Sequence, residues 1–123
     1  GFHLPALISP DAVVNEDVII GEATVVFDGV IVNSGSRIGS AVILNTNSTI
    51  EHDCTIGDFT HVAPGVTLSG RVEIGKNSFI GAGSTIIHRT KVTGNCIIGA
   101  GSVVIRNCMA SGIYVGNPAK KIK

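Results

Sequence analysis

The sequence is poor in aromatic and sulfur-containing side chains. Its 123 residues include no tryptophan, one tyrosine, four phenylalanines and one methionine. This length predicts a single domain with room for a core of its own. Because large aromatic rings are scarce, isoleucine, valine and leucine must build that core.

Paired cysteines and long apolar runs are also lacking. The chain has three cysteines, an odd number, and its apolar runs are only a few residues long. The odd count argues against a disulfide framework and fits a reducing compartment. With such short runs, we expect no signal peptide and no membrane span. We therefore predict a cytoplasmic domain with no membrane span and no nucleic-acid partner.

The charges balance overall but not along the chain. Residues 1–70 carry one basic and eight acidic side chains, whereas residues 71–123 carry eight basic and one acidic. Such asymmetry points to a charged ligand or partner, and the basic half would favour an anion. Solvated faces of opposite sign are the simpler interpretation.

An aliphatic residue recurs every six positions. The series runs from Ile8 to Val104, and all seventeen of its members are Ile, Val or Leu. A small residue (Ala, Val, Ser, Thr or Cys) recurs with the same period, two positions ahead of the aliphatic one, in a series that runs from Ala6 to Cys108. This alternation predicts short strands that turn both series inward, so Cys54, Cys96 and Cys108 are expected to be small core residues.

Glycines recur at a multiple of this period. Gly21, Gly39, Gly57 and Gly75 follow the aliphatic position at intervals of eighteen, which corresponds to three strands per turn. About six triangular turns would stack as parallel strands at a spacing of roughly 4.8 Å. We expect these glycines to relieve tight turns at one corner.

The pattern resembles the hexapeptide repeat of acyltransferases with a left-handed parallel β-helix. The resemblance covers residues 6–108. Residues 1–5 look like the junction to an N-terminal domain that this sequence lacks, and residues 109–123 look like a tail that caps the helix. Within the tail, Gly112–Lys120 ends in Gly-Asn-Pro-Ala-Lys, similar to the Gly-x-Pro-Ala-Lys ending of many family members.

The stretch from Asn45 to Val62, which contains Ile-Glu-His-Asp-Cys and a second histidine, resembles one subgroup. This subgroup comprises bacterial nucleotide-sugar N-acetyltransferases and sialic-acid O-acetyltransferases. The resemblance implies transfer from acetyl-CoA to the amino group of a nucleotide-linked sugar in glycan biosynthesis, with O-acetylation of sialic acid or another sugar as the alternative. It implies His52 as general base and Asp53 as its carboxylate partner, with Glu51 as the second choice.

Further roles are expected for residues around this stretch. We expect contacts with acetyl-CoA from His61, Gly70, Ala82 and Ala100, contacts with its phosphates from Arg106, Lys120 and Lys121, and a substrate contact from Asn45.

The period of eighteen places the two motif histidines apart. His61 follows His52 by nine residues, or half a turn, so the imidazoles should lie on opposite sides of one chain. A site that used both would need two chains, and a homotrimer is expected from the resemblance. Gly70, His88 and Arg106 continue the column of His52 toward the basic half.

Two other functions fit the same pattern. One is a non-catalytic β-helix that serves as a trimerisation module. The other is a zinc enzyme similar to β-helix carbonic anhydrases, which would need His52, His61 and His88 to converge at an interface. We predict no metal site, and we expect His3 and His88 to be structural or exposed.

Overall fold

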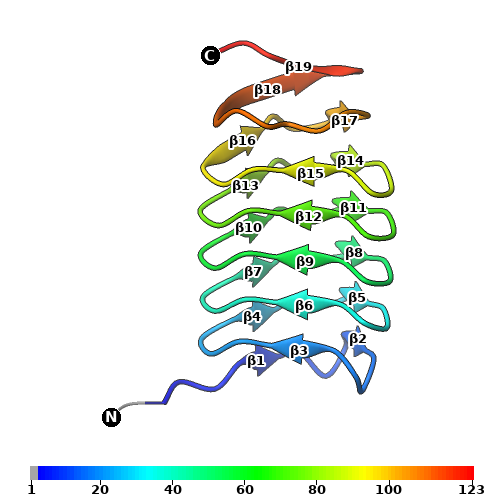
Figure 1. Cartoon of the computed structure of the whole chain (residues 1–123). Coiled ribbons are helices and arrows are strands. Elements are labelled where there is room, and N and C mark those ends of the chain that lie inside the picture. The colour runs from blue at the N-terminus through cyan, green and yellow to red at the C-terminus, as the bar shows by residue number, and fades with distance from the viewer. Residues whose placement is uncertain (1–2) are drawn as a thin grey trace.

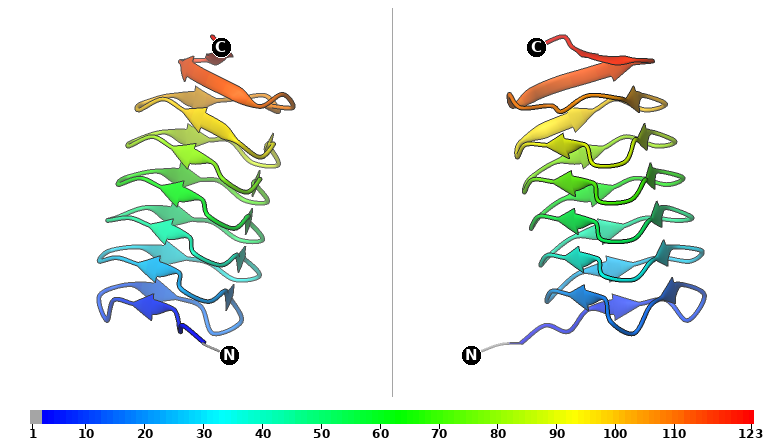
Figure 2. Two further views of the ribbon diagram at one scale, coloured as in Figure 1. Left: turned by 90° about the vertical axis from the view of Figure 1, so that its left-hand side faces the viewer. Right: turned by 45° about the vertical axis from the view of Figure 1, so that its right-hand side comes forward.

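A computed structural model describes residues 3–123, which form strands β1 to β19 and no helix that could cross a membrane. The strands stack into a three-sided prism, with the two ends of the chain at opposite ends of the stack (Figures 1 and 2).

Each side of the prism is one sheet. Sheet A contains, in spatial order, β1 (Leu7–Ile8), β4 (Val25–Val26), β7 (Ile43–Leu44), β10 (His61–Val62), β13 (Phe79–Ile80), β16 (Cys96–Ile98), β18 (Gly112–Gly116) and β19 (Ala119–Lys121). Sheet B contains β2 (Val13–Val14), β5 (Ile31–Val32), β8 (Thr49–Ile50), β11 (Thr67–Leu68), β14 (Thr85–Ile86) and β17 (Val103–Val104). Sheet C contains β3 (Ile19–Ile20), β6 (Arg37–Ile38), β9 (Thr55–Ile56), β12 (Glu73–Ile74) and β15 (Lys91–Val92).

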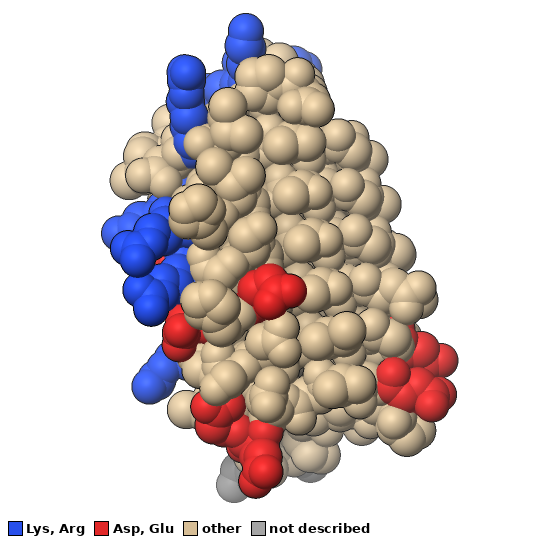
Figure 3. Space-filling view, turned by 90° about the vertical axis from the view of Figure 1, so that its right-hand side faces the viewer, with Lys and Arg blue, Asp and Glu red and all other residues tan. Residues whose placement is uncertain are grey.

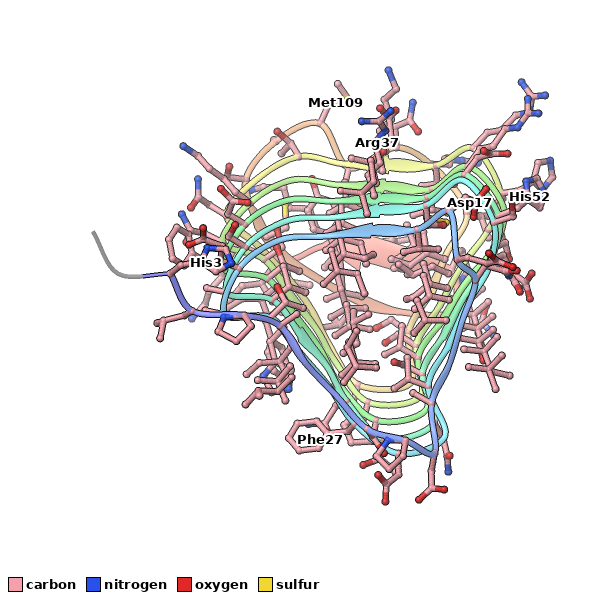
Figure 4. The ribbon with its side chains drawn as sticks, turned by 90° about the horizontal axis from the view of Figure 1, so that it is seen from below. His3, Asp17, Phe27, Arg37, His52 and Met109 are labelled. Atoms are coloured by element: carbon pink, nitrogen blue, oxygen red, sulfur yellow. The ribbon has the colours of Figure 1, made fainter. Side chains whose placement is uncertain are left out.

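From β1 to β17, neighbouring strands within a sheet are parallel and eighteen residues apart in register. His61, for example, pairs with Ile43 below it and with Phe79 above it. Seen from the N-terminal end, the chain turns anticlockwise as it recedes from the viewer (Figure 4), so the helix is left-handed. The predicted fold, a left-handed β-helix with three strands per turn and about six turns, is confirmed.

The aliphatic series fills the centre of the prism. Its members from Val26 to Val104 are at most 3% exposed, whereas Ile8 in the first coil is 46% exposed. Each buried side chain of this size stabilises the fold by roughly 1.5–3 kcal/mol. One such residue on every strand thus compensates for the lack of large aromatic rings.

The small series lies inside the corners, where several of its polar members form hydrogen bonds with the backbone. The Thr24 hydroxyl donates to the carbonyl of Gly39 at 2.7 Å and accepts the N–H of Val42 at 3.1 Å. The Ser84 hydroxyl does the same with Gly99 and Ser102. A buried polar group costs free energy unless it is hydrogen-bonded, so these hydroxyls link successive coils where no strand pairing exists.

The three cysteines are free and buried, in keeping with their expected place in the core. Burial raises the pKa of the Cys54 and Cys108 thiols to about 11. Both thiols are therefore protonated and unreactive at neutral pH.

The glycines spaced by eighteen have a different role from the one expected. None of the four has a positive φ, so the turn itself does not require them. A Cβ on Gly75 would instead lie 2.3 Å from the backbone nitrogen of Gly94, and one on Gly57 would lie 2.5 Å from that of Lys76. These glycines allow the backbones of successive coils to approach closely at the corner between sheets C and A.

The last residues of the chain extend sheet A. β18 runs parallel to β16, and β19 turns back to pair with β18 in the antiparallel sense. Both strands cross the C-terminal end of the prism (Figure 1).

The close approach at Gly75 predicts a large cost for adding one methyl group. Gly75→Ala should destabilise the fold by about 1–3 kcal/mol in denaturant unfolding, because the clash is with backbone rather than with a movable side chain. Gly83→Asn is the control: a Cβ there meets no atom within 4 Å, and asparagine tolerates the positive φ. Equal stability of the two variants would contradict this explanation.

Candidate active site

His52 and Asp53 form a hydrogen-bonded pair at the corner between sheets B and C, called here the B–C corner. Asp53 has a φ of +58°, and this left-handed turn brings the side chains of two consecutive residues together. Nδ1 of His52 lies 3.0 Å from Oδ2 of Asp53. A carboxylate can only accept, so Nδ1 donates to Asp53, and in the neutral ring the free electron pair is on Nε2.

The alternative carboxylate, Glu51, has another partner. Its Oε2 accepts a hydrogen bond of 2.8 Å from Nδ2 of Asn33, one coil below. The geometry therefore pairs His52 with Asp53 rather than with Glu51.

Gly70 stands directly above the His52 ring, one coil further along. A Cβ at this position would lie 2.5 Å from Nε2 and 2.9 Å from Cε1 of His52. Only glycine thus allows the imidazole to lie in this orientation.

An open depression of about 320 Å³ lies at this point of the surface. It is lined by His52, Gly70, Arg71, His88 and Arg89. The depression combines one imidazole, oriented by its carboxylate, with two guanidinium groups. It can therefore accept a proton and attract an anion at the same place.

His61 lies on sheet A, where Asn45 fixes its ring. The Asn45 Oδ1 accepts the backbone N–H of Thr46 at 2.8 Å, which turns Nδ2 toward Nε2 of His61 at 3.2 Å. His61 thus accepts at Nε2 and carries its proton on Nδ1. The edge-to-face contact with Phe79, at 5.1 Å between ring centroids, holds the ring from above.

A strip of small residues runs along the corner between sheets A and B, called here the A–B corner. Pro64, Ala82 and Ala100 are exposed and stand eighteen residues apart. Beside them, a Cβ on Gly83 or Gly101 would meet no atom within 4 Å. The strip leaves room for an extended ligand parallel to the helix axis.

The two motif histidines are not brought together in one chain. His52 lies at the B–C corner together with Asp17, and Phe27 marks the A–B corner (Figure 4). His61 belongs to β10 of sheet A, the side of the triangle opposite the B–C corner. The separation expected from their spacing of nine residues is thus present.

The predicted phosphate contacts are also divided. Arg106 lies at the B–C corner, three coils above His52, whereas Lys120 and Lys121 lie on β19 of sheet A. Basic side chains gather toward the C-terminal half and acidic ones toward the N-terminal half (Figure 3). One chain therefore carries two basic regions on different sides.

No three His, Cys, Asp or Glu side chains among residues 3–123 are close enough to hold a metal ion. The zinc alternative would therefore require ligands from neighbouring chains. A second depression lies over sheet C and is lined in part by Glu73, Lys91 and Met109. Glu73 and Lys91 pair with each other at 3.5 Å, which leaves no oriented base there.

Arg71 and Arg89 were not among the predicted site residues. They follow Asp53 in register by one and two coils, a spacing that could have identified them as neighbours of His52.

The contact between Gly70 and His52 can be tested by a single methyl group. Gly70→Ala should displace the imidazole and break its hydrogen bond to Asp53, with little loss of thermal stability because the ring is at the surface. Nitrogen-15 spectra of the histidine side chains would report the change. Gly94→Ala, at another corner, should leave the His52 signals unchanged, and unchanged signals in Gly70→Ala would contradict the assigned contact.

Known proteins share this repeat and this fold. The family described as bacterial transferase hexapeptide (six repeats) matches residues 35–70 and 71–106. The acetyltransferase domain of PglB from Neisseria gonorrhoeae is 41% identical, with a TM-score of 0.97 over 99% of this chain and 60% of that one. PerB from Caulobacter crescentus, solved with CoA and GDP-perosamine, is 38% identical, with a TM-score of 0.98 over 100% of this chain and 59% of that one.

A curated relative also matches, over a shorter stretch of both chains. GDP-perosamine N-acetyltransferase from Escherichia coli O157:H7 is 34% identical over 63 residues, which are 51% of this chain and 28% of the relative. The chain thus spans little more than half the length of the solved relatives and less of the curated one. Its repeats and fold identify it as a member of the bacterial transferase hexapeptide family.

Proposed function

We propose that the chain transfers an acetyl group from acetyl-CoA to the amino group of a nucleotide-linked amino sugar in bacterial glycan biosynthesis. The observation that carries this proposal is the His52–Asp53 pair, whose imidazole lines an open depression. The presence of CoA and GDP-perosamine in the solved PerB complex supports the choice of donor and acceptor.

The proposed reaction needs one side chain that accepts a proton and later returns it. The amine nitrogen of the sugar attacks the thioester carbonyl carbon while Nε2 of His52 accepts the proton that the amine loses. The carbon–sulfur bond then breaks, and His52 returns the proton to the leaving sulfur. Asp53 keeps the proton on Nδ1 and stabilises the imidazolium in between.

Acetyl-CoA fits the small-residue strip at the A–B corner. Ala82 and Ala100 leave space for an extended pantetheine arm, and His61 and Asn45 stand beside the lower end of the strip. When bound, acetyl-CoA supplies the activated acetyl group. Lys120 and Lys121 of the same chain stand at the upper end of sheet A, where they can meet its phosphates.

His52 can reach this strip only from another chain, which favours a homotrimer. In a closed ring, the B–C corner of one chain would face the A–B corner of the next. Sheet B lies between these corners and would face the axis. Its outward residues are all uncharged: Val13, Ile31, Thr49, Thr67, Thr85 and Val103. Sheet C, in contrast, carries Arg37, Glu73 and Lys91.

We place the activity in the cytoplasm, where acetyl-CoA and nucleotide sugars are made. The three free thiols are compatible with such a reducing compartment.

The assigned base can be tested by thiol release from acetyl-CoA with a panel of amino-sugar nucleotides. His52→Ala should lower kcat by about 10²–10⁴-fold, the usual contribution of general base catalysis. Asp53→Ala should lower it less, because the imidazole remains. His3→Ala, which removes an exposed histidine from the first coil, is the matched control and should retain full activity. Wild-type turnover by His52→Ala would refute the proposed mechanism.

The composite site predicts that two inactive variants restore each other. His52→Ala removes the base, and Ala82→Trp blocks the strip on the other side of the chain. In an equal mixture of the two, about a quarter of the interfaces combine an intact His52 with an intact strip. We expect about that fraction of wild-type activity after co-expression. A mixture as inactive as its components would show that each site lies within one chain.

A further inference from the structure

Glu51, the residue immediately before His52, carries a carboxylate that has no cation. Its Oε2 accepts the 2.8 Å hydrogen bond from Nδ2 of Asn33. Within residues 3–123, Oε1 has no hydrogen-bond partner, and no lysine, arginine or histidine forms an ion pair with the side chain. The side chain is half-buried, and a carboxylate that loses part of its hydration without gaining a cation costs free energy.

The backbone holds Glu51 in a fixed place beside the proposed base. Its N–H donates to the carbonyl of Leu68, and its carbonyl accepts the hydroxyl of Ser36, each at 2.9 Å. Consecutive Cα atoms are about 3.8 Å apart. The carboxylate of Glu51 and the imidazole of His52 therefore extend from neighbouring points at the end of sheet B.

The side chain of Glu51 lies on the side of His52 that faces the acidic half. Its partner Asn33 is one coil below. In the proposed function, acetyl-CoA extends from His52 the other way, because its phosphates meet Lys120 and Lys121 at the basic end (Figure 3). The donor thus occupies the upper side of the imidazole. The acceptor must approach from the lower side, where the carboxylate of Glu51 lies.

A neighbouring chain of the proposed homotrimer does not supply the missing cation. Its A–B corner would face Glu51. The six segments of that corner contain no lysine, arginine or histidine: residues 9–12, 27–30, 45–48, 63–66, 81–84 and 99–102. Closing the interface would remove more water from the carboxylate, which raises the cost of leaving it without a cation. The balancing charge then has to come from a ligand.

A sugar amine is a cation when it arrives, because such amines are protonated at neutral pH, as the lysine side chain is. The ammonium gives one proton to water before the nitrogen attacks. The nitrogen becomes positive again when it bonds to the thioester carbonyl carbon, until Nε2 of His52 takes the second proton. A carboxylate beside the nitrogen stabilises both positive forms. A hydroxyl acceptor, in contrast, is neutral when it arrives.

We infer that Glu51 binds the ammonium form of the acceptor's amino group and thereby selects an amine over a hydroxyl. This inference rests on the proposed function and assigns to one residue the choice between N-acetylation and O-acetylation. Glu51 acts through its charge, Asn33 orients it, and His52 remains the base.

Calorimetry can test this role without turnover. The separate probes are GDP-perosamine, its analogue with a hydroxyl in place of the amine, and acetyl-CoA. Glu51→Gln removes the charge but keeps an oxygen that can accept from Asn33. It should bind GDP-perosamine roughly 10–100-fold more weakly, as expected for a lost charge-assisted hydrogen bond, and the other two probes as tightly as the wild type does. Glu73→Gln, the same exchange on sheet C, should match the wild type with all three.

Thiol release gives a second measure of the same preference. In Glu51→Gln, the ratio of kcat/KM for GDP-perosamine to kcat/KM for the hydroxyl analogue should fall by the same factor as the affinity. A purely structural role would lower both values equally and leave the ratio unchanged.

Three results would overturn the inference. Glu51→Gln could bind GDP-perosamine as tightly as the wild type, it could bind both acceptors equally more weakly, or the wild type could bind the two acceptors equally well. The proposed function fails separately: a chain that binds the amine through Glu51 but releases no thiol from acetyl-CoA would retain the ammonium site and lose the reaction.

Discussion

The stacking of identical coils is the constraint on which the rest of this structure depends. Each coil must return to the same place after eighteen residues so that its N–H groups meet the carbonyls above. That condition forces a buried aliphatic residue onto every strand and a small residue into every corner. It also leaves a few surface positions per coil whose side chains are not restricted by the core. His52, Gly70 and Arg89 occupy such positions. The candidate site can therefore be built by changing surface residues while the core and the strand pairing stay the same.

Much of this arrangement could be predicted from the sequence because the six-residue repeat is strictly periodic. The eighteen-residue register located Gly70 above His52 and His61 on the opposite side. The role of the spaced glycines was mistaken, because one-dimensional spacing cannot distinguish a turn with positive φ from a close approach of two backbones. The choice between Glu51 and Asp53 also needed coordinates, since it depends on the hydrogen bond between Glu51 and Asn33.

The His52–Asp53 pair lies at the boundary between the acidic and the basic region of the molecule. The carboxylate of Asp53 orients the imidazole and would repel an anion bound beside it. Arg71 and Arg89 stand one and two coils higher in the same column. The imidazole of His52 thus lies where the electrostatic character of the corner changes sign.

Because the coils rise regularly, side chains along the B–C corner are spaced at fixed intervals. Groups in one column are separated by whole numbers of coils, about 4.8 Å each, and never by a continuous range of distances. A ligand that touches two levels must match one of these steps. In such a fold, evolution can change the length of the accepted ligand by moving a charged residue from one coil to the next, while core, register and base remain as they are.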